Sequence, residues 1–389
     1  MLAVVKRIGR QMCVLLPLLL TMFVAGCAST GRMPLSQQAL EWRNWPLERK
    51  IAQMLLLGFP GESVTESSPI IVAIRDYGVG GVVLFDNNAD LGVTERNITS
   101  PQQLRRLTSD LQQAADIPLF IAVDQEGGVV ARLKDRYGFP PTFSAAYLGE
   151  KNDLEVTAAA SAALADTLKE YGFNMNLAPV VDLNSNPANP VIAMKQRSFS
   201  ADPVQVAAHA AEFIKSHRSR KIITCLKHFP GHGSSREDSH LGLVDVTRFW
   251  SDQELLPYRY LLDKGLGDMV MTAHTFNTSL DPDYPATLSQ KTVDGILRQR
   301  LGFDGVVVSD DLYMGAIVQH YSYETAVEKA LDAGVDLLVV ANDKLYNPEV
   351  APRTIALIKQ LVDRGRISRE RIDQACGRII ALKLKYLGK

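Results

Sequence analysis

The sequence has 389 residues, of which 46% are hydrophobic and 22% are charged, so the chain is long enough to bury a sizeable core. Its formal net charge is −1 and it has no basic stripe with interleaved aromatic residues, which argues against a nucleic-acid partner. The four cysteines lack the C-x-x-C spacing of a metal site, and a disulfide framework is not expected in so large a core.

The N-terminus has the pattern of an export signal. Basic residues precede the apolar run 14–26, which is too short to span a bilayer comfortably. The run ends in small residues directly before Cys27, which resembles a bacterial lipobox. We therefore expect residues 1–26 to be a lipoprotein signal peptide and Cys27 to be lipid-modified. The alternatives are an ordinary signal peptide and a single membrane anchor.

A lipid on Cys27 would also determine the cellular location of the protein. Acyl chains on Cys27 would hold the protein at a membrane surface without crossing the bilayer, and residues 27–39 would form a tether. Because Ala28 follows the cysteine, the pattern resembles the outer-membrane sorting pattern of Gram-negative bacteria. The sequence thus predicts a lipid-anchored protein of the bacterial cell envelope, on the periplasmic or surface face, with a folded domain over residues 40–389.

From residue 40 onward, short apolar runs alternate with longer amphipathic stretches. Continuous apolar runs are typical of parallel strands that are buried on both faces. Helical patterns lie between most of them, one opening at Ser100 and another ending at Gly172. The eight apolar runs are 54–59, 80–85, 118–124, 175–182, 222–228, 268–274, 305–311 and 336–342.

Eight strand–helix units predict an α/β protein with one domain, a (β/α)8 TIM-like barrel. A doubly wound open sheet is the alternative. Its dinucleotide-binding version loses support because no G-x-G-x-x-G follows the first strand.

Polar residues recur where the predicted strands end. In a barrel, the carboxyl ends of the strands converge on one rim, where active sites are built. One aspartate after a strand is usually a helix cap, but capping alone does not explain such consistent placement. The residues are Asp124, Asp182, Lys227, His228, His274, Asp310, Asp311 and Asn342.

Asp310 is the strongest candidate for covalent chemistry. A carboxylate that directly follows a buried strand is held rigidly at the barrel mouth, which suits a nucleophile or an electrostatic stabiliser. We expect Asp311, its neighbour, to serve instead as a helix cap and structural hydrogen-bond acceptor.

The stretch "KHFPGHGSSREDSH", residues 227–240, holds three of the seven histidines. Pro230 and Gly231 exclude a helix or a strand, so we expect a long loop. A turn in this loop would bring Asp238 and His240 together. A carboxylate that accepts an imidazole N–H makes the other ring nitrogen a proton shuttle near neutral pH. A nucleophile and an acid/base together suit retaining glycoside hydrolysis, although the usual pair is two carboxylates.

Further polar residues on the rim are suited to binding a sugar. Asp124 offers bidentate contacts to hydroxyl groups, and Arg132 follows it after a predicted Gly-Gly turn. Arg197 lies in a polar loop after the fourth strand. On composition alone, both arginines are also compatible with solvated surface positions.

Four stretches together resemble the family 3 glycoside hydrolases, in the single-domain branch of the β-N-acetylglucosaminidases (β-N-acetylhexosaminidases). They are "AVDQEGGVVAR", "RSFS", "KHFPGHGSSREDSH" and "VVVSDDLYMGA", in the same order as in the family, from about Gln53 to Asp343. Other members, the β-glucosidases, usually have a second domain that supplies a glutamate acid/base. This chain is too short for such a domain and has Asp-Ser-His instead.

The resemblance implies a role for each site residue. Asp310 would be the nucleophile that forms a covalent glycosyl-enzyme, and His240 the acid/base, polarised by Asp238. No metal and no organic cofactor are implied, and the protein is expected to be a monomer whose partners are a small glycan and the membrane. The sugar-binding roles of the family fall on Asp124, Arg132, Arg197, Lys227 and His228.

The resemblance also implies exo removal of β-linked GlcNAc from a non-reducing end, in peptidoglycan fragments or chitooligosaccharides. Val129 stands where many relatives have a basic residue, which affects subsites but not catalysis. Members that recycle peptidoglycan are typically cytoplasmic. An exported chain therefore favours trimming of wall fragments or imported chitooligosaccharides at the envelope.

Several alternatives stay open on the sequence. A β-glucosidase or β-xylosidase specificity, and transfer to phosphate in place of water, are both compatible with these residues. A non-catalytic sugar-binding lipoprotein is another, although it would be expected to have lost one of the three catalytic residues. A metal-dependent hydrolase lacks the usual H-x-H after the first strand; its ligands would be His228, His232, Asp238 and His240.

Overall fold

The computed structural model describes residues 41–87, 96–343 and 346–388. These residues belong to one compact unit. The predicted signal peptide, the predicted lipid site at Cys27 and the tether at 27–39 lie outside the described residues. Within the described part of the chain, no helix is both long and apolar enough to cross a membrane.

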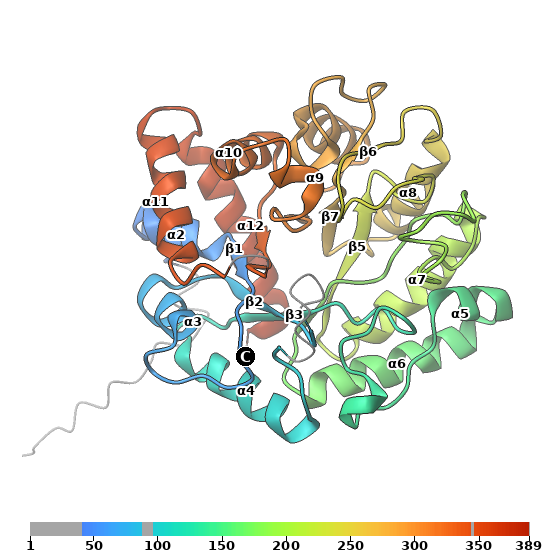
Figure 1. Ribbon diagram of the computed structural model, residues 1–389, viewed down its shortest axis with the longest axis horizontal. Helices are drawn as coiled ribbons and strands as arrows, with labels where there is room; N and C mark the ends of the chain where they lie inside the picture. The colour runs from blue at the N-terminus through green and yellow to red at the C-terminus, as the bar shows by residue number, and fades with distance from the viewer. Residues whose placement is uncertain (1–40, 88–95, 344–345, 389) are drawn as a thin grey trace, which may run out of the picture. The chain divides into compact units, whose positions relative to one another are not determined.

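Eight parallel strands form the centre of the fold in the order β10-β1-β2-β3-β4-β5-β7-β9 (Figure 1). Val308 of β9 bridges Leu337, next to β10, so the sheet curves into a nearly closed barrel. Seven of the eight strands lie within a predicted apolar run and β5 ends one residue beyond its run, so the barrel is confirmed and the open sheet was wrong. The strands are β1 (Leu55–Leu57), β2 (Gly81–Leu84), β3 (Phe120–Val123), β4 (Met175–Asn176), β5 (Ile223–Phe229), β7 (Met269–Thr272), β9 (Val306–Ser309) and β10 (Leu338–Val340).

Helices surround this barrel (Figure 1). Their ends follow local chemistry: the Ser100 hydroxyl accepts a hydrogen bond from the Gln103 amide at the start of α4, and Gly334, at φ +111°, ends α10. The α-helices are α2 (Leu47–Gln53), α3 (Pro69–Val72), α4 (Pro101–Ala114), α5 (Ala145–Lys151), α6 (Leu154–Glu170), α7 (Pro203–Arg218), α8 (Leu256–Asp263), α9 (Gly315–Val318), α10 (Tyr323–Ala333), α11 (Val350–Asp363) and α12 (Arg369–Leu387).

Smaller elements lie between these units. A two-stranded parallel sheet pairs β6 (Val244–Asp245) with β8 (Thr275–Phe276) beyond the ends of β5 and β7. Two residues are too few to show a periodic pattern, so this sheet was not predicted. In the described ranges, the remaining elements are two π-helical segments, η2 (Ala73–Tyr77) and η7 (Lys291–Arg300), and four 3-10 turns, η1 (Trp42–Asn44), η4 (Asp135–Tyr137), η5 (Asp252–Leu255) and η6 (Ala286–Leu288).

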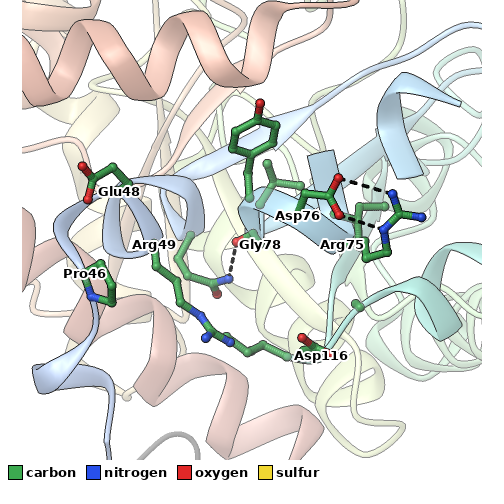
Figure 2. Close-up of a pocket in the computed structure, with 13 residues that line it drawn as sticks. Pro46, Glu48, Arg49, Arg75, Asp76, Gly78 and Asp116 are labelled. Atoms are coloured by element: carbon green, nitrogen blue, oxygen red, sulfur yellow. Dashed lines mark hydrogen bonds and ion pairs between the residues drawn. The ribbon is translucent and has the colours of Figure 1, made fainter. Parts of the chain in front are cut away.

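The amino-terminal end of the barrel is closed by a buried lysine. Lys383 of α12 is 1% exposed, and its Nζ donates to Gln53 Oε1 and to the Gly80 carbonyl, both at 2.8 Å. A cavity of about 310 Å³ lies at this end, where Arg75 pairs with Asp76 (Figure 2). Its lining residues precede strands β1, β2 and β3, so this cavity is at the opposite end of the barrel from the predicted active-site rim.

Candidate active site

The predicted rim residues do meet at the carboxyl end of the barrel. Asp124 directly follows β3, Lys227 and His228 are near the end of β5, and Asp310 directly follows β9. Because these strands are parallel, their carboxyl ends place side chains from distant parts of the sequence at one mouth.

Lys227 carries a fixed positive charge in this mouth. Its side chain is 2% exposed, and its Nζ lies 2.8 Å from Asp124 Oδ1 and 2.7 Å from Glu126 Oε1. Burial alone would lower the pKa of Lys227, but the two carboxylates outweigh burial and raise it. Burial would likewise raise the pKa of Asp124, and the neighbouring Lys227 and Arg132 lower it instead. Lys227 and Asp124 therefore both stay ionised near neutral pH.

Glu126 joins two of the predicted sugar-binding residues, although it was not itself predicted. It accepts two hydrogen bonds from Arg197, from Nε at 2.8 Å and from Nη2 at 2.7 Å. Burial would raise the pKa of Glu126, but Arg197 and Lys227 hold it well below its usual range. The signal that sequence reasoning passed over is its place two residues after Asp124, in the same motif.

Arg197 is buried in the wall of the mouth and is not a solvated surface charge. Besides its pair with Glu126, its Nη1 donates to the Val191 carbonyl at 3.2 Å, and its Nη2 lies 3.2 Å from His228 Nε2. Burial would lower the pKa of this guanidinium, yet Glu126 raises it. These contacts all join Arg197 to other residues of the wall, so a direct contact between Arg197 and a sugar stays a prediction.

His228 is oriented by Asp182, a second residue that was not included among the predicted site residues. Asp182 Oδ2 lies 2.7 Å from His228 Nδ1, and Asp182 Oδ1 accepts from the His232 amide at 2.8 Å. Because Nε2 of His228 faces a guanidinium donor, the hydrogen bonds fit the tautomer that carries its proton on Nδ1. Burial would raise the pKa of Asp182, but His228 lowers it.

Arg132 also lies at the mouth. Its Nη2 is 3.5 Å from Asp124 Oδ2, and its Nη1 is 3.9 Å from Asp86 Oδ1. Asp86 follows β2 and is completely buried, and it also pairs with Lys134 at 2.6 Å. Its place directly beyond the apolar run 80–85 was the sequence signal for Asp86. Arg132 is therefore held beside Asp124, and its contact with a sugar stays a prediction.

Asp238 and His240 form the predicted pair. Asp238 Oδ1 lies 2.6 Å from His240 Nδ1 and also accepts from the His240 amide at 2.9 Å. The side-chain hydrogen bond is the main reason why the pKa of Asp238 falls well below its usual range. The His240 side chain is 55% exposed, and its role as an acid/base stays a prediction.

Asp310 is a half-buried carboxylate at the end of β9. Burial would raise its pKa, but the imidazoles of His274 and His228, and then of His240, lower it. In the ranges that the structure describes, no lysine or arginine makes an ion pair with Asp310. An ionised carboxylate without a cation partner is suited to attack an electrophilic carbon.

Asp311 is a structural hydrogen-bond acceptor, as we expected, but it does not cap α9, whose N-cap residue is Met314. Its Oδ1 accepts from the Ala341 amide at 2.8 Å and from the Tyr313 amide at 3.3 Å. Burial raises its pKa to about 7. These bonds tie the segment after β9 to the end of β10, and so they fix the backbone that carries Asp310.

The four ligands of the metal-hydrolase alternative are not brought together. His228 bonds to Asp182, both ring nitrogens of His232 bond to serines, and His240 bonds to Asp238. Among the described residues, no group of three or more histidine, cysteine, aspartate or glutamate side chains is arranged to hold a metal ion.

The fold and this site define a family. Residues 46–382 match the family model described as "Glycosyl hydrolase family 3 N terminal domain". The chain therefore belongs to glycosyl hydrolase family 3, as its motifs predicted.

Similar proteins carry a more specific name. The chain is 36% identical over 325 residues to a "Beta-hexosaminidase" of Xylella fastidiosa (strain M23), covering 80% of this chain and 92% of the relative. It is 34% identical over 336 residues to "Beta-hexosaminidase A" of Pseudoalteromonas piscicida, covering 80% of this chain but 54% of the relative. The chain thus spans nearly all of the first relative and about half of the second.

Solved structures agree with these relatives. A family 3 β-N-acetylglucosaminidase of Paenibacillus sp. str. FPU-7 has a TM-score of 0.80 at 36% identity, covering 88% of this chain and 63% of that one. A β-N-acetylhexosaminidase of Beutenbergia cavernae DSM 12333 has a TM-score of 0.77 at 29% identity, covering 87% of this chain and 98% of that one.

Proposed function

We propose that this protein is a retaining exo-β-N-acetylglucosaminidase, in which Asp310 is the nucleophile and His240 the acid/base. The observation that supports the proposal is that the loop bearing the Asp238–His240 pair is bonded to the segment that follows Asp310. The loop that bears the pair bonds to α9 through the Ser239 carbonyl and the Ala316 amide, at 3.2 Å, and α9 begins five residues after Asp310. The names of the relatives support the choice of N-acetylhexosamine over glucose.

The first step forms a covalent bond. Asp310 attacks the anomeric carbon through one carboxylate oxygen while the glycosidic bond breaks. His240, protonated on both ring nitrogens and held by Asp238, gives its Nε2 proton to the departing oxygen, so the aglycone leaves as a neutral alcohol. Donating this proton as the bond breaks lowers the barrier by the ordinary effect of general acid catalysis.

The second step reverses these roles. The neutral His240 now has a lone pair on Nε2 and takes a proton from water. The resulting oxygen nucleophile attacks the anomeric carbon and releases the Asp310 carboxylate. Two displacements at the same carbon give net retention of the β configuration.

The remaining predicted residues would bind the sugar. Lys227 and Asp124 present an ammonium donor and a carboxylate acceptor side by side, a pair that suits adjacent hydroxyl groups. Arg132 adds a second cation beside Asp124. We assign Arg197 and His228 to the same wall, where Glu126 and Asp182 orient them.

We further propose that the protein acts at the cell envelope as a lipid-anchored monomer, with residues 1–26 removed and Cys27 modified. Its substrates would be peptidoglycan fragments or chitooligosaccharides with terminal β-linked GlcNAc. The lipobox-like sequence before Cys27 supports the anchor. In a bacterial host, Cys27→Ala should move the protein from the membrane fraction to the soluble fraction, and an unchanged distribution would contradict the anchor.

Two measurements test the chemistry. Proton NMR should show the β anomer of GlcNAc as the first product, whereas the α anomer would exclude a retaining mechanism. A fluorinated derivative of N-acetylglucosamine that reacts slowly should trap the glycosyl-enzyme. Mass spectrometry of the digested protein should then find the mass of one sugar added to the peptide that contains Asp310. Labelling at another residue would reassign the nucleophile.

A further inference from the structure

The middle residue of the Asp-Ser-His triplet is the buried one. Ser239 is 2% exposed, whereas the side chains of Asp238 and His240 are 21% and 55% exposed. The two hydrogen bonds between Asp238 and His240 lie within a three-residue turn. These bonds set the geometry of the pair itself but do not place it relative to Asp310, so other contacts must supply that placement.

Ser239 makes hydrogen bonds through both its side chain and its backbone. Its hydroxyl lies 3.1 Å from Nε2 of His232, and its carbonyl accepts from the Ala316 amide at 3.2 Å. One residue further on, the Leu241 carbonyl accepts from Nε2 of Gln319 at 2.8 Å. The loop is therefore fastened to its own base by His232 and to the region of α9 by Ala316 and Gln319.

His232 is a rigid support for this loop. It is 2% exposed, and burial lowers its pKa to about 4, so its ring is neutral near neutral pH. Its amide donates to Asp182 at 2.8 Å. The next residue, Gly233, donates its amide to Glu254 Oε2 at 3.0 Å. The base of the loop is thus bonded both to the segment after β4 and to η5.

The hydrogen bonds around His232 also define its tautomer. The Ser235 hydroxyl donates to the His232 carbonyl at 3.0 Å, so the same hydroxyl must accept from Nδ1 of the ring, 2.8 Å away. Nε2 is then an acceptor, and the Ser239 hydroxyl is the donor of the 3.1 Å bond. This gives the Ser239 hydroxyl a defined direction.

Gly315 lets the loop approach α9. A Cβ atom at Gly315 would lie 2.6 Å from the His240 carbonyl and 3.0 Å from the Leu241 carbonyl carbon. Such distances are too short for a side chain, so a residue larger than glycine would push away the backbone that carries His240.

We propose that Ser239 fastens the acid/base loop, and that His232 and Gln319 are positioning residues that hold His240 against the mouth beside Asp310. This inference deepens the proposed function and rests on it, because it concerns the placement of the proposed acid/base. Neither His232 nor Gln319 takes part in the proton transfer. Each acts through the backbone or the hydroxyl of the loop.

A misplaced acid has a distinctive kinetic effect. A substrate with a poor leaving group, such as methyl β-N-acetylglucosaminide, needs the proton from His240 in order to react. A substrate with a good leaving group, such as the dinitrophenyl glycoside, expels its aglycone largely without it. Loss of positioning therefore lowers kcat/KM for the methyl glycoside much more than for the dinitrophenyl glycoside. Loss of general structure lowers both equally.

The test uses the full-length protein and two variants that remove one hydrogen-bond donor each. Ser239→Ala removes the hydroxyl, and Gln319→Met removes the amide at nearly constant size. For each variant, kcat/KM for the methyl glycoside should fall about tenfold more than for the dinitrophenyl glycoside, which corresponds to the loss of one hydrogen bond. Azide, which attacks the glycosyl-enzyme without needing a base, should raise kcat for the dinitrophenyl glycoside in these variants.

Two further variants complete the design. His320→Ala, at the exposed residue beside Gln319, should behave like the wild type with both substrates. His240→Ala should show the largest difference between the two substrates. Equal losses on both substrates in Ser239→Ala and Gln319→Met, with a large difference in His240→Ala, would overturn the positioning role alone. No difference in His240→Ala would overturn the proposed acid/base and this inference with it.

Discussion

Glu126 and Arg197 are joined inside the barrel mouth by two parallel hydrogen bonds, of 2.7 Å and 2.8 Å, across 71 residues of sequence. Their side chains are 5% and 9% exposed. Lys227 shares the same carboxylate at 2.7 Å. The Glu126 carboxylate thus contacts two buried cations, and it shares Lys227 with Asp124.

This arrangement predicts a large effect of Glu126→Gln on stability. The amide keeps the size of the side chain but leaves the charges of Arg197 and Lys227 less compensated in a buried position. We expect the free energy of unfolding to fall by about 3 kcal/mol, measured by urea denaturation. Glu170→Gln is the matched control, because Glu170 pairs with Arg105 on the surface, where both side chains are more than half exposed.

The control should lose less than about 0.5 kcal/mol, as is usual for exposed ion pairs. Equal effects of the two substitutions would show that the buried pair contributes no more than a surface pair. That result would contradict the role given to Glu126.

The charge of Asp238 predicts a second effect, on catalysis. Asp238→Asn keeps an acceptor for His240 Nδ1 but removes the negative charge that stabilises the protonated ring. We expect kcat for a GlcNAc disaccharide to fall about a hundredfold, with little change in thermal stability. Glu237→Gln changes the charge of the exposed neighbouring residue and should leave kcat within about twofold of the wild type. A loss of less than threefold in Asp238→Asn would mean that the pairing is not needed for proton transfer.

Glu254 predicts a dependence of stability on pH. It is 2% exposed, and burial raises its pKa from 4.5 to about 7. Between these values the unfolded chain loses the proton while the folded protein keeps it. The contribution of Glu254 to stability is therefore fully present below pH 4.5 and is lost as the pH rises to about 7, by roughly 3 kcal/mol in total.

Glu254→Gln isolates this contribution, because the variant cannot ionise at this position. The free energy of unfolding of the variant minus that of the wild type should grow by roughly 3 kcal/mol between pH 4.5 and pH 7, then stay constant. Asp311, whose pKa is also raised to about 7, contributes equally to both proteins and cancels in the difference. A difference that is independent of pH would show that Glu254 is ionised in the folded protein.

The barrel was predictable from the sequence because each of its strands is a continuous apolar run. The same runs predicted that Asp124, Lys227, His228 and Asp310 lie on one rim. In a parallel barrel the carboxyl ends of all strands lie at the same end, so residues at these ends share one rim. Asp238 and His240 were predictable because they lie two residues apart, so that their contact is local.

The contacts that support the site were not predictable in this way. Glu126 looks like an ordinary loop charge until the fold brings Arg197 to it, and Asp182 looks like a helix cap until the base of the 227–240 loop closes over it. Gln319 has no sequence signal at all, because its bond to Leu241 depends only on how α9 packs. Such long-range pairs follow from tertiary structure, which residue spacing does not show.

The most direct test of the central claim is hydrolysis of p-nitrophenyl β-N-acetylglucosaminide, compared with the corresponding β-glucoside, by the wild-type protein and by Asp310→Ala. We predict that the wild type releases p-nitrophenol selectively from the N-acetylglucosaminide and that the variant loses at least about a thousandfold in kcat/KM. Release by the variant at the wild-type rate, or no release by the wild type from either substrate or from a GlcNAc oligosaccharide, would contradict the account.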